Sequence, residues 1–281
     1  MIKGLGTALI TPFKADKSVD YEALARLLDT QLTGAVDYIV VLGTTGEAAT
    51  MTEDEKREVR TYIRQYVNGR LPLVLGVGGN NTAAVCESLR TIDLTGFEAI
   101  LSVCPYYNKP NQEGLFQHFR AVAEASPIPV ILYNVPGRTG VNLLPETVMR
   151  IYEAQPKKIV GIKEASGNVE QIKHLIDLAK DKLMVISGDD GIACEIMEAG
   201  GAGLISVASN AFPQDFYAIV HKKDQAKQAQ YEQMVKLLFK EGNPVGIKAV
   251  LAQKGIIQNY LRLPLVPASA VLQEDIQKEL A

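Results

Sequence analysis

Eight short apolar runs, separated by amphipathic segments, constrain the fold of this 281-residue chain more than any other feature. Each run is continuous rather than alternating, which is typical of parallel strands buried on both faces. Successive runs begin roughly 20 to 35 residues apart, which leaves room for one crossover helix between neighbours. The runs are Gly6–Ile10, Tyr38–Leu42, Leu73–Val77, Ala99–Val103, Pro129–Tyr133, Ile159–Lys163, Leu183–Ser187 and Gly203–Val207.

The segments between the runs carry helix signals. Ser18 or Asp20 can cap a helix that stops at Gly34, and a capping box at 52–55 begins a helix that ends near Gly69. Eight strand–helix units predict an α/β fold, a closed (β/α)8 TIM barrel. An open dinucleotide-binding sheet is disfavoured, because no Gly-x-Gly-x-x-Gly follows the first strand.

The strand pattern stops after about residue 211. Four helical segments follow, at 212–224, 226–242, 244–261 and 268–281. The first of these completes the barrel, and the other three predict a small C-terminal helical appendage. We therefore expect a catalytic barrel over residues 1–224 and a helical domain over 225–281.

Composition narrows the class of protein. Apolar residues make up 47% of the chain and the formal net charge is -3, which gives no electrostatic reason to expect nucleic acid or an anionic membrane as a partner. No run approaches the roughly 18 apolar residues of a spanning helix, and the N-terminus lacks a signal-peptide pattern. Three scattered cysteines indicate free thiols and a cytoplasmic location, and the three histidines lack metal-ligand spacing.

The sixth run ends on a lysine. The carboxyl ends of barrel strands carry the chemistry, and Lys163 arrives there directly after four apolar-run residues, 159–162. Burial disfavours the ammonium form, and a neutral amine is a nucleophile toward carbonyls. The alternative is a buried ion pair with Glu164 or another carboxylate. No strand end offers a cluster of metal ligands, so amine chemistry is the best-supported option.

Three other strand ends carry polar groups. The run 43–47 (Gly-Thr-Thr-Gly-Glu) offers the hydroxyls of Thr44 and Thr45 to an anion, or forms a tight turn. In the loop 104–110, Tyr106 and Tyr107 either form part of a site or pack within an interface or loop.

The fifth strand ends on a tyrosine and is followed by an arginine. Tyr133 is either a proton carrier or a core tyrosine whose hydroxyl is satisfied. Arg138, in a loop rich in Gly and Pro, is either a fork for a carboxylate or a solvated charge. The two together favour a functional role.

Four motifs in their order and spacing identify a family. The stretches "GTTGE", "YYNKP", "YNVPGRTG" and "GIKEASGN" closely resemble those of the 4-hydroxy-tetrahydrodipicolinate (dihydrodipicolinate) synthases, in the N-acetylneuraminate lyase superfamily. The resemblance covers essentially the whole chain. It implies a barrel with a C-terminal helical domain, a homotetramer built as a dimer of dimers, and no cofactor. It also implies condensation of pyruvate with L-aspartate 4-semialdehyde in diaminopimelate and lysine biosynthesis.

The resemblance also implies roles for single residues. Lys163 would form the Schiff base with pyruvate, and Tyr133 would shuttle protons beside it. Thr44 would link Tyr133 to Tyr107, which in the family comes from the neighbouring subunit. The remaining matches are Thr45 for the pyruvate carboxylate, Arg138 for the semialdehyde carboxylate, and the carbonyls of Gly188 and Ile205 as lining groups.

The feedback site of lysine-inhibited relatives is matched only in part. Asn80 and Tyr106 match it, whereas Glu53, Lys56 and Ala84 stand where inhibited members carry two histidines and a glutamate. We therefore expect little inhibition by millimolar lysine.

Two alternatives to the synthase stay open. One is another lyase of the same superfamily, such as N-acetylneuraminate lyase or a keto-acid aldolase, although the loop "YNVPGRTG" favours the synthase. The other is a barrel that has lost catalysis and serves as a binding or structural protein. Against that alternative stand the intact Lys163, Tyr133, Thr44 and Tyr107.

Overall fold

Eight strands form a closed barrel in the order β1 to β8, with parallel pairing between β1 and β2 and between successive strands from β3 to β8. The computed structural model describes residues 2–281. The barrel confirms the predicted fold class. The strands are β1 (Gly4–Ala8), β2 (Tyr38–Val41), β3 (Leu73–Gly76), β4 (Ala99–Val103), β5 (Val130–Asn134), β6 (Ile159–Glu164), β7 (Met184–Ser187) and β8 (Gly203–Ser206).

Strand bounds differ from the sequence prediction by at most two residues, and β4 matches it at both ends. The first strand begins at Gly4, two residues earlier than expected. β5 and β6 each continue one residue further, to Asn134 and Glu164, because these two residues pair with each other in register. Tyr133 and Lys163 are therefore the penultimate residues of their strands.

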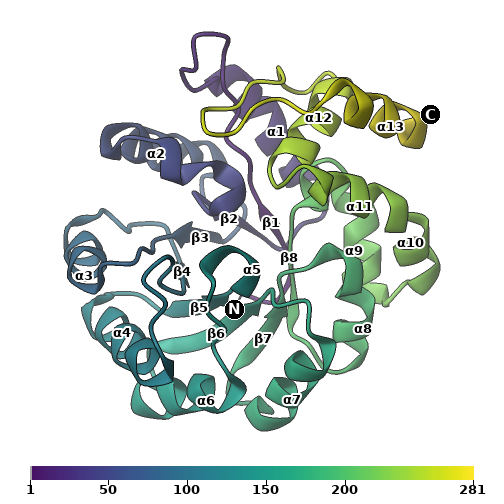
Figure 1. Ribbon diagram of the computed structural model, residues 1–281. Coiled ribbons are helices and arrows are strands. Elements are labelled where there is room, and N and C mark those ends of the chain that lie inside the picture. The colour runs from purple at the N-terminus through teal and green to yellow at the C-terminus, as the bar shows by residue number, and fades with distance from the viewer. Residues whose placement is uncertain (1) are drawn as a thin grey trace. The chain divides into compact units, whose positions relative to one another are not determined.

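The chain divides into two compact units, which we describe separately. The first comprises Leu73–Ile205 with the N-terminal segment that ends at Lys3. In this unit α3, α4, α6 and α7 pack in sequence against one another and follow the outside of the strands (Figure 1). Its helices are α3 (Thr82–Thr91), α4 (Gln112–Ala125), α5 (Pro136–Thr139), α6 (Pro145–Ala154), α7 (Val169–Ala179), η3 (Asp190–Ile192) and α8 (Ala193–Glu198).

The second unit comprises Gly4–Pro72 and Ser206–Ala281. The C-terminal helices α11, α12 and α13 pack on one another, and α9 packs on β1. Its helices are α1 (Tyr21–Thr33), η1 (Thr44–Gly46), η2 (Ala48–Thr50), α2 (Glu53–Val67), η4 (Ala208–Asn210), α9 (Pro213–Lys222), α10 (Gln225–Gln230), α11 (Glu232–Lys240), α12 (Val245–Gln253) and α13 (Ala270–Leu280).

Local helix signals fall where the sequence predicted them. Asp20 caps α1 through Ala23, and Gly34 ends that helix. Thr52 and Glu55 form the predicted capping box of α2, whose left-handed cap is Asn68. These caps fix where each helix starts and so where the preceding loop must turn.

The segment 226–242 is two helices rather than one. Tyr231 separates α10 from α11, because its side chain is held by α9. Its hydroxyl donates to Asp215 Oδ2 at 2.6 Å, and its ring packs against Phe212 and Phe216. The predicted helical segment 244–261 is also shorter in the structure, where α12 ends at Gln253. The division into a barrel of 1–224 and a helical domain of 225–281 stays a prediction.

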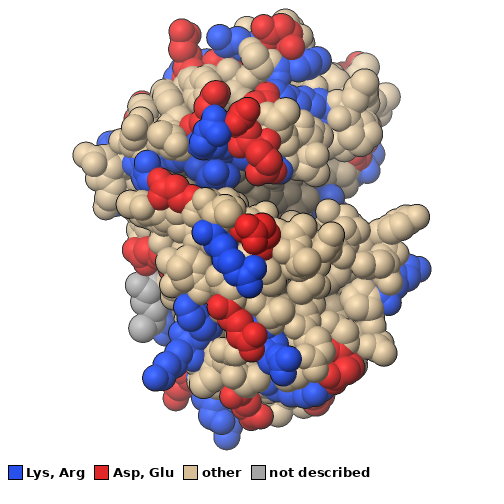
Figure 2. All heavy atoms as spheres, turned by 90° about the vertical axis from the view of Figure 1, so that its left-hand side faces the viewer, with Lys and Arg blue, Asp and Glu red and all other residues tan. Residues whose placement is uncertain are grey.

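Charged side chains are mixed on the surface. In Figure 2, Lys and Arg side chains lie beside Asp and Glu side chains across the face shown. Pairs within α2 join Lys56 to Glu53 and Arg57 to Asp54, each at 2.8 Å. Such pairs leave no extended field of one sign on that face. Among residues 2–281, no helix has both the length and the apolar character needed to cross a bilayer.

Candidate active site

Lys163 and Tyr133 are register partners at the carboxyl ends of β6 and β5. Each side chain is 6% exposed. The ammonium nitrogen of Lys163 lies 4.5 Å from the centroid of the Tyr133 ring. Within residues 2–281 no carboxylate forms an ion pair with Lys163. The buried amine therefore faces an aromatic ring and has no counter-ion, so the ion-pair interpretation of Lys163 is wrong.

Glu164 points away from Lys163. Successive side chains of a strand project to opposite faces. Glu164 is 0% exposed, and its Oε2 accepts from Asn134 Nδ2 at 2.9 Å. Burial raises the pKa of the Glu164 carboxyl, and its hydrogen bonds to Asn134 and Ser166 oppose that shift. The two neighbours thus occupy separate environments on the two faces of β6.

Gly188 makes room for the lysine. A Cβ atom at position 188 would lie 2.8 Å from Lys163 Cε and 2.6 Å from the Cβ of Ala165. The backbone N–H of Gly188 donates to the carbonyl of Glu164 at 2.8 Å. This hydrogen bond to β6 holds the Gly188 backbone close to the Lys163 side chain. Gly188 therefore borders Lys163, and the role of its carbonyl as a lining group stays a prediction. Ile205, the other predicted lining residue, lies in β8 and is 1% exposed.

Arg138 lies in α5, a single helical turn that follows β5 directly and that the sequence predicted as loop. Its side chain is exposed. The turn is closed by Gly140, whose φ of 73° is left-handed, and by the Thr139 hydroxyl, which donates to the carbonyls of Val135 and Val141. Figure 1 shows α5 at the strand ends, inside the arc of outer helices of this unit.

The loop after β4 presents two tyrosines. Tyr107 is 89% exposed and has a φ of 73°, and Tyr106 is 43% exposed. Asn80 Nδ2 donates to the Tyr106 carbonyl at 3.0 Å, and Asn108 Nδ2 donates back to the Asn80 carbonyl at 2.9 Å. The structure therefore brings together Asn80 and Tyr106, the two residues that match the effector site. A ring as exposed as Tyr107 packs on little of its own chain.

Thr44 and Thr45 form the turn η1 after β2, in the second unit. Thr44 is exposed, whereas Thr45 is 2% exposed. The hydroxyl oxygen of Thr45 accepts from Asn243 Nδ2 at 2.9 Å, just before α12. Glu47, which ends this turn, adopts the left-handed conformation with φ 53°. The stretch forms the tight turn that one interpretation predicted, and the binding of an anion by its hydroxyls stays a prediction.

A buried ion pair supports the same turn, and sequence reasoning missed it. The Lys248 ammonium of α12 pairs with Glu47, and both side chains are 0% exposed. Lys248 also donates to the Tyr260 carbonyl at 3.0 Å and lies 4.2 Å from the centre of the Phe13 ring. Burial lowers the pKa of Lys248 to about 8, although the Glu47 carboxylate opposes that shift. The signal in the sequence was a lysine within the apolar run 245–251.

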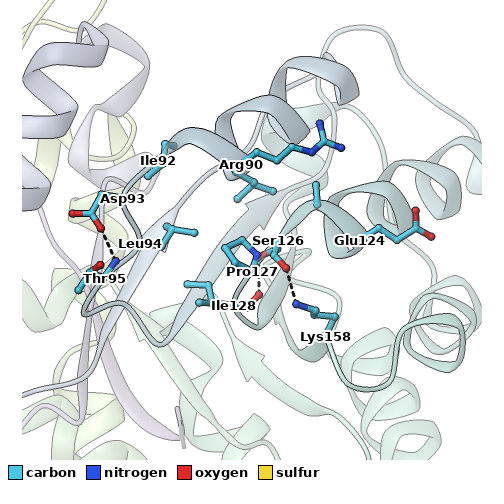
Figure 3. A pocket seen from close by; sticks show the side chains of 12 residues that line it. Arg90, Ile92, Asp93, Leu94, Thr95, Glu124, Ser126, Pro127, Ile128 and Lys158 are labelled. Carbon is cyan, nitrogen blue, oxygen red and sulfur yellow. Dashed lines mark hydrogen bonds between the residues drawn. The ribbon is translucent and has the colours of Figure 1, made fainter.

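Two cavities lie away from these residues, at the amino ends of the strands. A cavity of about 730 Å³ is bordered by the chain before β4, β5 and β6 (Figure 3). Its polar groups bond to one another: Lys158 Nζ donates to the Ser126 carbonyl at 2.7 Å, and the Thr95 N–H donates to Asp93 at 3.0 Å. A second cavity, of about 570 Å³, is bordered by the chain before β6, β7 and β8. Neither includes Lys163.

No metal centre is formed by the described part of the chain: no group of three or more His, Cys, Asp or Glu side chains could hold an ion within residues 2–281. The three cysteines, Cys86, Cys104 and Cys194, are buried free thiols. Burial, and next the nearby Glu164 carboxylate, raises the pKa of the Cys104 thiol. The Cys104 thiol is therefore a poor nucleophile.

The fold is a closed parallel barrel, and the buried Lys163 amine lies at the carboxyl end of one of its strands. This arrangement defines a class of barrels in which a lysine amine can react with a carbonyl group. A family model described as the dihydrodipicolinate synthetase family matches residues 1–281. The chain belongs to this family.

Individual relatives agree with the family model. A protein of Parabacteroides distasonis named 4-hydroxy-tetrahydrodipicolinate synthase is 49% identical over 99% of this chain and 96% of its own length. The structure of dihydrodipicolinate synthase from Acinetobacter baumannii complexed with pyruvate superposes with a TM-score of 0.95 and 39% identity, over 100% of this chain and 98% of that one. A monomeric dihydrodipicolinate synthase variant gives a TM-score of 0.95 and 40% identity, over 99% and 95%.

Proposed function

We propose that this protein is a 4-hydroxy-tetrahydrodipicolinate synthase, which condenses pyruvate with L-aspartate 4-semialdehyde in the diaminopimelate route of lysine biosynthesis. The observation that carries the proposal is the Lys163 amine, buried at a strand end against the Tyr133 ring and without a counter-ion. The family membership over the full chain supplies the reaction.

The reaction begins on Lys163. Its neutral amine attacks the ketone carbon of pyruvate, and loss of water gives an iminium ion that acts as an electron sink. A proton then leaves the methyl carbon to give an enamine. The enamine carbon attacks the aldehyde carbon of the semialdehyde. The amino group of that substrate finally displaces the Lys163 nitrogen, which closes the ring and restores the free amine.

Each of these steps moves a proton, and the proposed carrier is the Tyr133 hydroxyl. We propose that Thr44 and the Tyr107 of a second copy continue the relay. The exposure of Tyr107, 89% in the single chain, supports a role completed by another subunit. The proposed assembly is a homotetramer, a dimer of dimers. Because a monomeric variant exists in the family, sedimentation analysis is the measurement that distinguishes a tetramer from a smaller assembly or a monomer.

Two groups bind the carboxylates of the substrates in this proposal. Thr45 and its backbone N–H hold the pyruvate carboxylate, and the Asn243 amide donates to the Thr45 hydroxyl oxygen, which leaves the hydroxyl hydrogen to donate onward. Arg138 binds the carboxylate of the semialdehyde through its planar fork. The carbonyls of Gly188 and Ile205 line the pocket. The proposal requires no metal or organic cofactor, and it places the enzyme in the cytoplasm, in keeping with the three free thiols.

Turnover tests the proposal. The purified protein should consume pyruvate and aspartate semialdehyde together, measured by coupling the product to the next, reductive step. It should not release pyruvate from N-acetylneuraminate. Cleavage of N-acetylneuraminate without condensation would instead assign the chain to the sister lyases, and inactivity in both assays would indicate a barrel that has lost catalysis.

We also propose that lysine inhibits this enzyme little. Lys56 and Glu53 are two of the residues that depart from the inhibited pattern. They form an ion pair with each other at 2.8 Å, so each charged group already has a partner within α2. We expect less than a twofold loss of activity in millimolar lysine, about the change that 0.4 kcal/mol produces. A steep inhibition curve in the coupled assay would contradict this.

A further inference from the structure

A buried polar network lies on the face of β5 and β6 opposite Tyr133 and Lys163. Asn134 and Glu164 are register partners, one residue beyond the Tyr133–Lys163 pair, and both are 0% exposed. Asn134 Nδ2 donates to Glu164 Oε2 at 2.9 Å. The same two strand ends thus hold the candidate reacting groups on one face and this network on the other.

Glu164 acts in the network only as an acceptor. Its Oε1 accepts from the Ser166 N–H at 2.7 Å, and its Oε2 accepts from Asn134 and, at 3.4 Å, from Gln171 Nε2. All three donors are neutral, and within residues 2–281 no basic side chain forms an ion pair with Glu164. Burying a carboxyl group without a cation costs free energy, so packing alone does not explain why a glutamate is buried at position 164.

Asn134 extends the network to the segment that carries Arg138. Its Nδ2 also donates to Asn142 Oδ1 at 2.8 Å, and its Oδ1 accepts from the Leu143 N–H at 2.9 Å. Asn142 and Gln171 then exchange hydrogen bonds of 2.7 and 3.1 Å between their side-chain amides. The segment 135–143, with α5 inside it, is therefore held at its far end by Asn134, with further hydrogen bonds to Asn142 from Gln171 and Gln112.

The orientation of that asparagine depends on Glu164. The Leu143 N–H can only donate, so Asn134 must turn its oxygen toward Leu143 and its NH2 group toward position 164. Position 164 must then accept from Asn134 and from Ser166 at the same time. A carboxylate does both. A glutamine cannot, because its oxygen is needed by the Ser166 N–H and its NH2 group would then face that of Asn134.

We propose that Glu164, acting through Asn134, is a positioning residue that sets where Arg138 meets the carboxylate of the semialdehyde. This inference rests on the proposed role of Arg138. A displacement of a substrate-binding group by about 1 Å can cost two orders of magnitude in rate, so a network outside the pocket can control binding within it.

The test is a reciprocal exchange. Glu164→Gln and Asn134→Asp should each raise the KM for aspartate semialdehyde about tenfold. The rate at which borohydride traps pyruvate on Lys163 should change by less than about twofold, because that rate reports the other face of the strands. The double variant restores an acceptor opposite a donor at this contact and should recover most of the loss. Asn142→Ala, at a half-buried position, offers a milder variant with the same direction of effect.

A matched control separates positioning from stability. Ser126→Ala removes a hydrogen bond of 2.6 Å to the Ile128 carbonyl at the opposite ends of the strands, and it should lower the melting temperature without changing either KM. Single variants that lower only the melting temperature would overturn the inference, and so would a double variant no better than the worse single one. Arg138→Leu distinguishes a failure of the proposed role of Arg138 from a failure of the inference about Glu164. If it leaves the semialdehyde KM unchanged, the role of Arg138 and this inference both fail. If it alone raises that KM, only this inference fails.

Discussion

Two buried lysines in this chain differ in whether a carboxylate compensates them. Lys248 pairs with Glu47, and both are sealed from water. Lys163 is nearly as buried, yet among residues 2–281 it has no carboxylate partner, and its ammonium group lies over the Tyr133 ring. An aromatic face attracts a cation less strongly than a carboxylate does. Lys163 therefore has the environment that suits a nucleophilic amine, and Lys248 has that of a structural cation.

The space around Lys163 can be tested at Gly188. In Gly188→Ala the new methyl group would lie within 3 Å of Lys163 Cε and of Ala165 Cβ. We expect the lysine side chain to be displaced, a stability loss of about 1–3 kcal/mol, and pyruvate adduct formation slowed at least about tenfold. Borohydride trapping followed over time measures this. Gly137→Ala is the control, since a Cβ there meets nothing within 4 Å, and it should trap pyruvate at the wild-type rate.

At the scale of the element, α12 supports the turn that carries Thr45. Asn243, just before the helix, donates to the Thr45 hydroxyl, and Lys248 within the helix holds Glu47. The Arg262 N–H adds a bond of 3.1 Å to the other oxygen of Glu47. The C-terminal segment thus supports a strand-end turn.

Breaking the buried pair should be costly. Lys248→Met leaves the Glu47 carboxylate buried without its cation, and we expect the free energy of unfolding to fall by about 3–5 kcal/mol. In Lys248→Met with Glu47→Gln no charge stays buried, so much of that loss should return. Denaturant titration of the three proteins checks this. Equal stability of the single and double variants would show that the charge on Glu47 is not what destabilises the single one.

Helix α4 contributes a pH dependence through His118. Its side chain is 4% exposed, Nδ1 shares a hydrogen bond of 2.9 Å with the Thr82 hydroxyl, and burial lowers the pKa to about 4. The unfolded chain, with an ordinary histidine pKa near 6.5, binds the proton more readily than the fold does between pH 6.5 and 4. Stability therefore falls as the pH drops through this window.

The expected size of that effect is about 3 kcal/mol of unfolding free energy, fully lost by pH 4. His118→Gln keeps a polar side chain of similar size that does not titrate, so its stability should fall by that much less over the same range. Denaturant titrations at pH 7 and pH 4 provide the comparison. Equal acid sensitivity in the two proteins would place the titrating group elsewhere.

At the scale of the whole molecule, strand periodicity predicted the barrel, because eight buried parallel strands leave the same continuous apolar signature. The caps at Asp20 and Thr52 were equally legible, since capping is local chemistry. What the sequence left open depended on contacts between distant residues. Whether Lys163 had a counter-ion needed the register of β5 and β6, and the partner of Glu47 lies about 200 residues away in α12.

The central claim of this account is that Lys163 is the nucleophile toward pyruvate. The most direct measurement is borohydride reduction in the presence of pyruvate, followed by peptide mapping by mass spectrometry. We predict one reduced pyruvate adduct, on Lys163. It should be absent from Lys163→Ala and retained in Lys158→Ala, a lysine at the other end of the same strand whose amine bonds to the Ser126 carbonyl. A full-yield adduct in Lys163→Ala, or none in the wild-type protein, would contradict the claim.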